Sequence, residues 1–185
     1  MDIEKINHVV DNTDAFIQLH SGIAFYFLNP NPDDILIEDI SHTLSMLCRF
    51  GGHCSEFYSV AEHSVRCSYA VPDEYKFEAL MHDAAEAYLV DMPRPIKNTL
   101  TGYRELEGNL DAVIRRKFGL PDKMSDMVTW VDNAMLATER RDLMSSSAEP
   151  WAWLPDPLDT KIVPWTTEEA REAFVSRYKE LTTGA

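Results

Sequence analysis

Apolar residues recur at steps of three and four along most of the chain after residue 35, which is the spacing of one buried helix face. Glycine and proline separate these stretches and mark where helices are expected to end. The first expected helix begins near Ile37 and is stopped by Gly51-Gly52. The next expected helices cover residues 59–70, 75–92, 106–118 and 124–136. This pattern predicts a compact all-α bundle.

Both ends of the chain depart from that period. Residues 22–28 (Gly-Ile-Ala-Phe-Tyr-Phe-Leu) run into an Asn-Pro-Asn-Pro turn, which predicts an extended arm of a small N-terminal hairpin. Residues 145–164 contain four prolines and predict an irregular loop packed by tryptophans. We expect Trp151, Trp153 and Trp165 to lie in the core or in a subunit contact. The Thr-Thr-Glu-Glu sequence at residues 166–169 is a capping box that opens a last helix.

Composition narrows the classes of function. The 185 residues include 31 acidic and 17 basic side chains, giving a net charge of −14. An apolar share of 45% and a charged share of 26% are ordinary globular values, and the length favours a single domain over residues 1–185. Phosphate backbones require clustered Lys and Arg, so no nucleic acid polymer is expected as a partner. A small phosphorylated ligand remains compatible, because one metal ion can reverse the charge of a pocket.

The sequence also carries signals about location. No run of 18 apolar residues is present, so no membrane partner is expected. The first 14 residues are acidic and polar, unlike a secretory signal. Cys48, Cys54 and Cys67 form no C-x-x-C pair and are expected as buried or free thiols in a reducing compartment. Together these features predict a cytoplasmic protein.

His82 and Asp83 are adjacent within a stretch of Ala, Leu and Met that is expected to be helical. Neighbours on a helix point about 100° apart, so both face one centre only if it lies between them. A metal ion meets this condition with one imidazole nitrogen and one carboxylate oxygen. His63 and Asp132 lie in other expected helices and would complete the ligand set. Two His and two Asp suit Mn, Co, Fe, Zn or Mg.

Glu86 follows His82 by one helical turn, where a general acid or base could act on an attacking water. Each residue alone also has a structural explanation. A buried histidine can be satisfied within a core, Asp132 can pair with Arg140 or Arg141, and Glu86 can be a solvated helix position. The combination of two His, two Asp and a Glu one turn on favours a metal site.

The order of His63, His82-Asp83 and Asp132 resembles the H…HD…D pattern of the HD-domain metal-dependent phosphohydrolases. Residues 61–64 (Ala-Glu-His-Ser), 82–86 (His-Asp-Ala-Ala-Glu) and 91–97 (Asp-Met-Pro-Arg-Pro-Ile-Lys) are similar to the 5′-deoxynucleotidase branch. They are also similar to viral dNTP triphosphohydrolases. The resemblance covers residues 35–145 and implies one HD-type domain with residues 146–185 as a C-terminal extension.

The resemblance assigns roles to individual residues. One divalent ion (Co, Mn, Zn or Mg) would be held by His63, His82, Asp83 and Asp132. Glu86 would position or deprotonate the attacking water. The substrate would be contacted by Arg49 and Lys97 at phosphate, by Asp91 at the sugar 3′-hydroxyl and by Phe50 at the base. Phe50 stands where the family usually has Trp, so the base preference stays open.

The implied activity is that of an enzyme cleaving the 5′-phosphoester of 2′-deoxynucleotides. Two reactions remain open: release of triphosphate from a dNTP, with dATP among the substrates, and release of phosphate from a dNMP. The alternatives are a non-catalytic metal- or nucleotide-binding module, and hydrolysis of another phosphoester such as ppGpp or a cyclic nucleotide. The family also implies a homo-oligomer, and for a viral protein the host cytoplasm.

Overall fold

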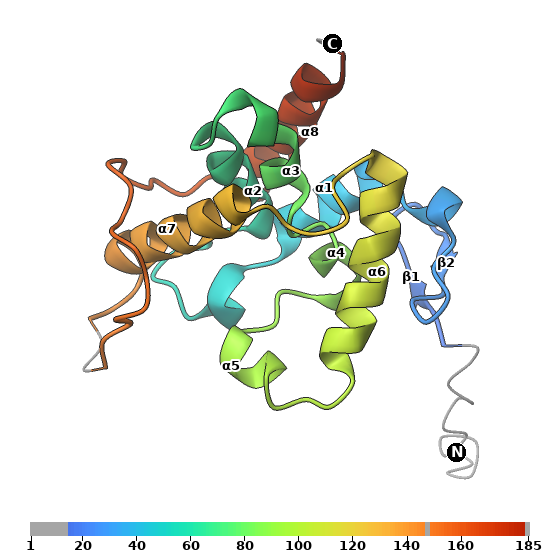
Figure 1. Cartoon of the computed structure of the whole chain (residues 1–185), viewed down its shortest axis with the longest axis horizontal. Coiled ribbons are helices and arrows are strands. Elements are labelled where there is room, and N and C mark those ends of the chain that lie inside the picture. Colours follow the sequence, from blue (N-terminus) through green and yellow to red (C-terminus); the bar gives the residue numbers. More distant parts are fainter. Residues whose placement is uncertain (1–14, 147–148, 184–185) are drawn as a thin grey trace.

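The computed structural model describes residues 15–146 and 149–183, and these are mostly helical (Figure 1). The all-α prediction is therefore confirmed. The helices are α1 (Ile37–Met46), α2 (Val60–Tyr69), α3 (Lys76–Met81), α4 (Glu86–Leu89), α5 (Arg94–Lys97), α6 (Tyr103–Phe118), α7 (Asp126–Leu143) and α8 (Thr167–Thr183). Within the described ranges, no helix is both long enough and apolar enough to cross a membrane.

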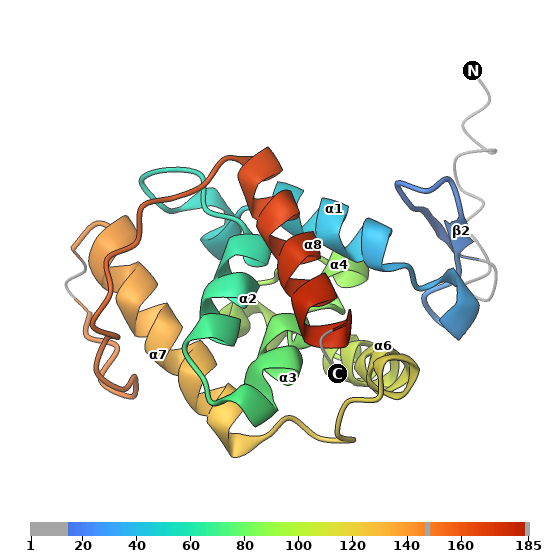
Figure 2. The same cartoon turned by 90° about the horizontal axis from the view of Figure 1, so that it is seen from above.

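Helix α2 lies at the centre of the bundle. It packs against α1, α3, α7 and α8, and Figure 2 shows α8 crossing over α1, α2 and α3. One apolar cluster includes Leu44, Val65, Leu80 and Phe174, so it joins α1, α2, α3 and α8. A second cluster, with Cys67 and Val131, fixes α7 against the other side of α2. Because α3 and α7 both pack against α2, residues of these three helices can approach one another.

The predicted helix ends are largely confirmed. Thr166 and Glu169 exchange side-chain-to-backbone hydrogen bonds of 2.8 and 3.2 Å, as a capping box requires. Ser59 accepts the amide of Glu62 at 3.1 Å and so begins α2. Gly119 ends α6 with a φ of +66°, a conformation that glycine adopts without strain.

The predicted hairpin is present and is very short. Strand β1 (Ile17–Gln18) pairs antiparallel with β2 (Ala24–Phe25), and Ile17 lies opposite Phe25. Phe25 is fully buried and its ring lies 4.4 Å from that of Tyr88 in α4. The hairpin therefore covers one side of the helical core.

The first helix ends earlier than its apolar period predicts. It stops at Met46, and Cys48 then forms a β-bridge with Ser59. Arg49 begins a separate 3₁₀ helix, η4 (Arg49–Gly52), so it lies outside the first helix, which was expected to continue to Gly51-Gly52. This bridge joins two residues on either side of the loop at residues 49–58, and helical periodicity does not report such a pairing.

The predicted third helix is interrupted at the residues expected to carry the chemistry. Turns at residues 82–85 separate α3 from α4, and the amide of Glu86 bonds to the carbonyl of Asp83 at 3.0 Å. His82 Nδ1 bonds to the carbonyl of Ala79 at 2.8 Å. An uninterrupted helix would offer that carbonyl to the amide of Asp83. The imidazole thus competes with the backbone and breaks the ladder.

The segment before α8 is irregular where it is described, as expected. Trp165 is half-buried and packs against the core. Trp153 is 58% exposed, which excludes the core and leaves a subunit contact, the other place expected for it. The guanidinium carbon of Arg94 lies 5.1 Å from the centre of the Trp153 ring, and this cation–π contact holds the exposed indole.

Candidate functional site

The four predicted ligands come together from three places in the fold. His63 lies within α2, His82 and Asp83 in the turn after α3, and Asp132 within α7. His63 Nε2 is 3.3 Å from His82 Nε2, 3.6 Å from Asp83 Oδ2 and 3.3 Å from Asp132 Oδ1. His82 Nε2 is 3.2 Å from Asp83 Oδ2 and 3.9 Å from Asp132 Oδ1. Atoms about 2.1 Å from one ion lie about 3.0–3.4 Å apart. Three of these five distances fall in that range, and the 3.6 Å and 3.9 Å distances are longer.

The outer nitrogen of each imidazole is held by an acceptor. His82 Nδ1 contacts the Ala79 carbonyl, which can only accept, so this nitrogen carries the proton. His63 Nδ1 lies 2.6 Å from Glu139 Oε1. In the neutral form of each ring Nε2 then carries the lone pair, and the two Nε2 atoms lie 3.3 Å apart. Two facing lone pairs require a cation or a proton between them. An acceptor at the outer ring nitrogen is the usual contact of metal-binding histidines.

Electrostatics at this centre favour positive charge. Burial opposes a charged ring, yet the carboxylates of Asp83 and Asp132 raise the pKa of His82 well above its ordinary value. Burial likewise opposes a charged Asp132, but hydrogen bonds with His63 and His82 hold its pKa well below the ordinary value. The carboxylates are therefore paired with positive charge at this centre.

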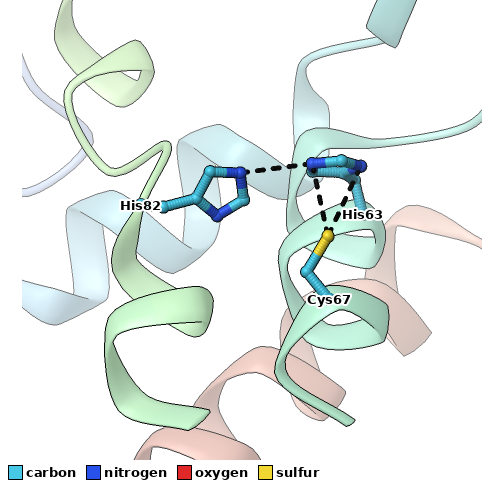
Figure 3. A group of neighbouring side chains, drawn as sticks. All are labelled: His63, Cys67 and His82. Carbon is cyan, nitrogen blue, oxygen red and sulfur yellow. Dashed lines mark hydrogen bonds between the residues drawn. The ribbon is translucent and has the colours of Figure 1, made fainter. Parts of the chain in front are cut away.

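A second group around the same histidines could also bind a metal. His63, Cys67 and His82 are all buried, and their ligand atoms lie within 4.8 Å of one another (Figure 3). However, Cys67 Sγ is 3.6 Å from Nε2 and 4.0 Å from Nδ1 of His63. The sulfur thus lies over the face of the ring, whereas the nitrogen lone pair lies in its plane. This geometry favours the two carboxylates over the thiol as partners of His63.

Cys67 was not among the predicted site residues. Its spacing of four from His63 on one helix was the available signal.

A cavity of about 820 Å³ adjoins the centre. Its size lies in the range of small-molecule sites. The predicted residues that line it are Arg49, Phe50, His82, Asp83, Glu86, Asp91, Lys97 and Asp132. His63 is fully buried behind them. The fold therefore gathers the predicted residues around one space.

Glu86 lies at this cavity with one carboxyl oxygen unsatisfied. Its side chain is buried, and Oε2 has no hydrogen-bond partner among the described residues. Burial, and then the charges of Asp83 and Asp91, raise the pKa of Glu86 well above its ordinary value. A buried carboxyl with a free oxygen and a raised pKa can hold or exchange a proton beside a ligand.

The two predicted phosphate-binding cations are already paired. Arg49 Nε lies 3.2 Å from Glu139 Oε2, and its Nη1 lies 3.5 Å from Asp83 Oδ2. Lys97 pairs with Glu107. An anionic ligand would therefore contact the terminal nitrogens of Arg49, and it would replace Glu107 as the partner of Lys97.

The backbone is strained at two positions beside the cavity. Phe50 has a φ of +58° and Val90, next to Asp91, a φ of +65°. Positive φ is unfavourable for both residues, and most of all for β-branched valine. Such strain is concentrated at functional sites, which is consistent with the placement of Phe50 and Asp91.

Several contacts at the site were missed by sequence reasoning. Arg94 Nη2 lies 3.6 Å from Asp132 Oδ2, so the arginine beside Asp132 is neither Arg140 nor Arg141, the two partners considered as a structural alternative. Trp153 lines the cavity instead of the core. Glu139 contacts both His63 and Arg49. Its spacing of seven from Asp132, two turns along one face of α7, was the signal available for it.

Comparison with known proteins adds relatives and no activity. No family model matches the sequence. The chain is 47% identical over 171 residues to the uncharacterised protein YfdR of Escherichia coli K12, covering 91% of this chain and 96% of YfdR. It is 38% identical over 117 residues to an uncharacterised protein of Rhodobacter capsulatus, covering 58% of this chain and 60% of that protein.

Proposed function

We propose that this chain, which belongs to the YfdR family, is a divalent-metal-dependent phosphohydrolase that cleaves the 5′-phosphoester of 2′-deoxynucleotides. The observation that supports this most directly is the convergence of two imidazole nitrogens and two carboxylate oxygens beside a ligand-sized cavity. The proposal includes membership of the HD-domain phosphohydrolases, whose ligand order the sequence resembles.

The ligand set would be His63, His82, Asp83 and Asp132, with Co, Mn, Zn or Mg as the ion. Such an ion polarises a phosphoryl oxygen and lowers the pKa of water. The positive charge of the ion is also needed for substrate binding, because four acidic residues line the cavity: Asp83, Glu86, Asp91 and Asp132. Without it these carboxylates would repel a phosphorylated substrate.

The remaining residues bind and orient the substrate. Arg49 is buried and lines the cavity, where its guanidinium would neutralise phosphate charge. Lys97 would contribute a second positive charge from α5. Asp91 would accept the sugar 3′-hydroxyl, and Phe50 would pack on the base. Glu86 would hold the attacking water through its free oxygen and accept its proton.

The test is a panel of metals and substrates. Protein stripped of metal and reloaded with Mn, Co, Zn or Mg is incubated with each dNTP and dNMP, and the products are separated by ion-exchange chromatography. Triphosphate plus deoxynucleoside would identify a dNTP triphosphohydrolase, and phosphate from dNMPs alone a 5′-nucleotidase. Asp132→Asn serves as the matched control, since it keeps the shape of a ligand and removes its charge. If the metal-loaded chain hydrolyses none of these nucleotides, the proposal is wrong.

A further inference from the structure

Glu139 is a fully buried carboxylate that contacts two different parts of the candidate site. It lies on α7 two turns after Asp132, with no exposed side-chain surface. Oε1 lies 2.6 Å from Nδ1 of His63, and Oε2 lies 3.2 Å from Nε of Arg49. Each oxygen therefore holds a different functional group.

The chemistry of a carboxylate determines what it does to His63. An ionised carboxylate only accepts hydrogen bonds, so His63 must place its proton on Nδ1. Nε2 is then left unprotonated and faces His82, Asp83 and Asp132. A ring in the other tautomer would direct N–H toward the metal position and could not bind an ion there.

The same carboxylate keeps Arg49 away from a metal ligand. Arg49 Nη1 already lies 3.5 Å from Asp83 Oδ2. Arg49 is buried, and a buried guanidinium requires a partner. If Glu139 no longer satisfied Nε, Asp83 would become the nearest remaining carboxylate for Arg49. The arginine would then compete with the ion for Asp83.

We propose that Glu139 is a positioning residue that joins the metal centre to the phosphate-binding arginine. One of its oxygens fixes the tautomer of His63, and the other fixes the direction of Arg49 across the cavity. Metal affinity and the placement of Arg49 therefore depend on one side chain that touches neither ion nor substrate. The inference rests on the proposed function for the identity of the bound ion and of the phosphate.

The testing variant is Glu139→Gln, which keeps the size of the side chain. Its amide oxygen can accept from His63 or from Arg49, and its NH₂ group then faces the other donor. We expect the affinity for Co²⁺, measured by titration calorimetry, to fall by about 10- to 100-fold. We also expect long-range ¹H–¹⁵N NMR spectra of the Zn²⁺-loaded variant to lose the single Nδ1–H tautomer of His63.

A matched control separates positioning from general stability. Thr138 is the neighbouring residue on α7 and is equally buried. Its hydroxyl accepts the amide of Leu158 at 2.8 Å and touches no predicted ligand. Thr138→Val should lower the midpoint of thermal unfolding and leave the Co²⁺ affinity and the His63 spectrum unchanged.

The outcomes distinguish this inference from the proposed function. If folded Glu139→Gln binds Co²⁺ as tightly as the wild type, the positioning role is overturned. If the variant does not fold, the wild-type Zn²⁺ spectrum decides, and coordination of His63 through Nδ1 would overturn the role. If the variant loses affinity while the wild type hydrolyses no nucleotide, the role of Glu139 stands and the proposed function fails.

Discussion

Glu86 and Asp83 are three residues apart, and their surroundings drive their protonation in opposite directions. Burial and the neighbouring charges of Asp83 and Asp91 raise the pKa of Glu86 well above its ordinary value. Burial also opposes ionisation of Asp83, but His82 and His63 lower the pKa of Asp83 to about 2. Titratable pairs separated in this way indicate different roles in acid–base chemistry. Asp83 suits the charged ligand, and Glu86 the residue that handles a proton.

This difference predicts opposite metal contents for two isosteric variants. Glu86→Gln should retain the bound metal and lose hydrolysis by about 10²-fold or more, the usual scale of general acid–base catalysis. Asp83→Asn should lose both, because it removes a charged ligand. Metal content by mass spectrometry and nucleotide hydrolysis by chromatography are measured on the same samples. Equal metal content in the two variants would contradict the division of roles.

Residue-level chemistry could be predicted only where the residue type itself was informative. His63, His82, Asp83 and Asp132 were recognisable because imidazoles and carboxylates among apolar residues need a partner. Glu139 was not recognisable in this way, since its contact with His63 spans 76 residues of sequence. That contact exists only because apolar packing fixes α7 beside α2.

The same distinction holds for whole elements. The C-terminal end of α6 and the N-terminal end of α8 were predicted because Gly119 and the capping box at residues 166–169 act locally. The break between α3 and α4 depends on where the His82 side chain points, and helix propensity carries no such information. An uninterrupted helical period therefore hid the turn that carries two of the candidate ligands.

Helix α7 also anchors the irregular segment that leads to α8. Asp142 Oδ2 accepts the amide of Ile162 at 2.8 Å, and Arg141 pairs with the same carboxylate. The hydrogen bond from Arg141, aided by the Ile162 amide, holds the pKa of Asp142 below its ordinary value. A lowered folded-state pKa stabilises the fold above the unfolded-state pKa, and this contribution is lost as pH falls.

Asp142→Asn should therefore lower the free energy of unfolding at pH 7 by about 1 kcal/mol, because one hydrogen bond loses its charged acceptor. The difference between wild type and variant should shrink as pH falls below about 4, where the wild-type carboxylate is protonated. Urea unfolding at several pH values measures this. A difference that stays constant down to pH 3 would show that the charge of Asp142 is not what anchors the segment.

At the scale of the molecule, the candidate centre links elements that are distant in sequence. Its four candidate ligands come from α2, from the turn between α3 and α4, and from α7. The unfolded chain does not hold these side chains together, so an ion that uses all of them binds the folded state selectively. The acidic excess of the chain, 31 residues against 17 basic ones, adds to the attraction for a cation.

Divalent metal should consequently raise the midpoint of thermal unfolding of the whole chain. At a concentration 100 times the dissociation constant the added stability is about 2.7 kcal/mol, which corresponds to roughly 5–10 °C for a chain of this size. Differential scanning fluorimetry with Mn²⁺ or Co²⁺ measures the shift. Asp132→Asn should abolish it because it removes a charged ligand, and Cys67→Ser should keep it because the sulfur lies beside both ring nitrogens of His63, at 3.6 and 4.0 Å, and not in line with one of them. Loss of the shift in Cys67→Ser alone would instead make the thiol a ligand, and no shift in the wild type would argue against a metal centre.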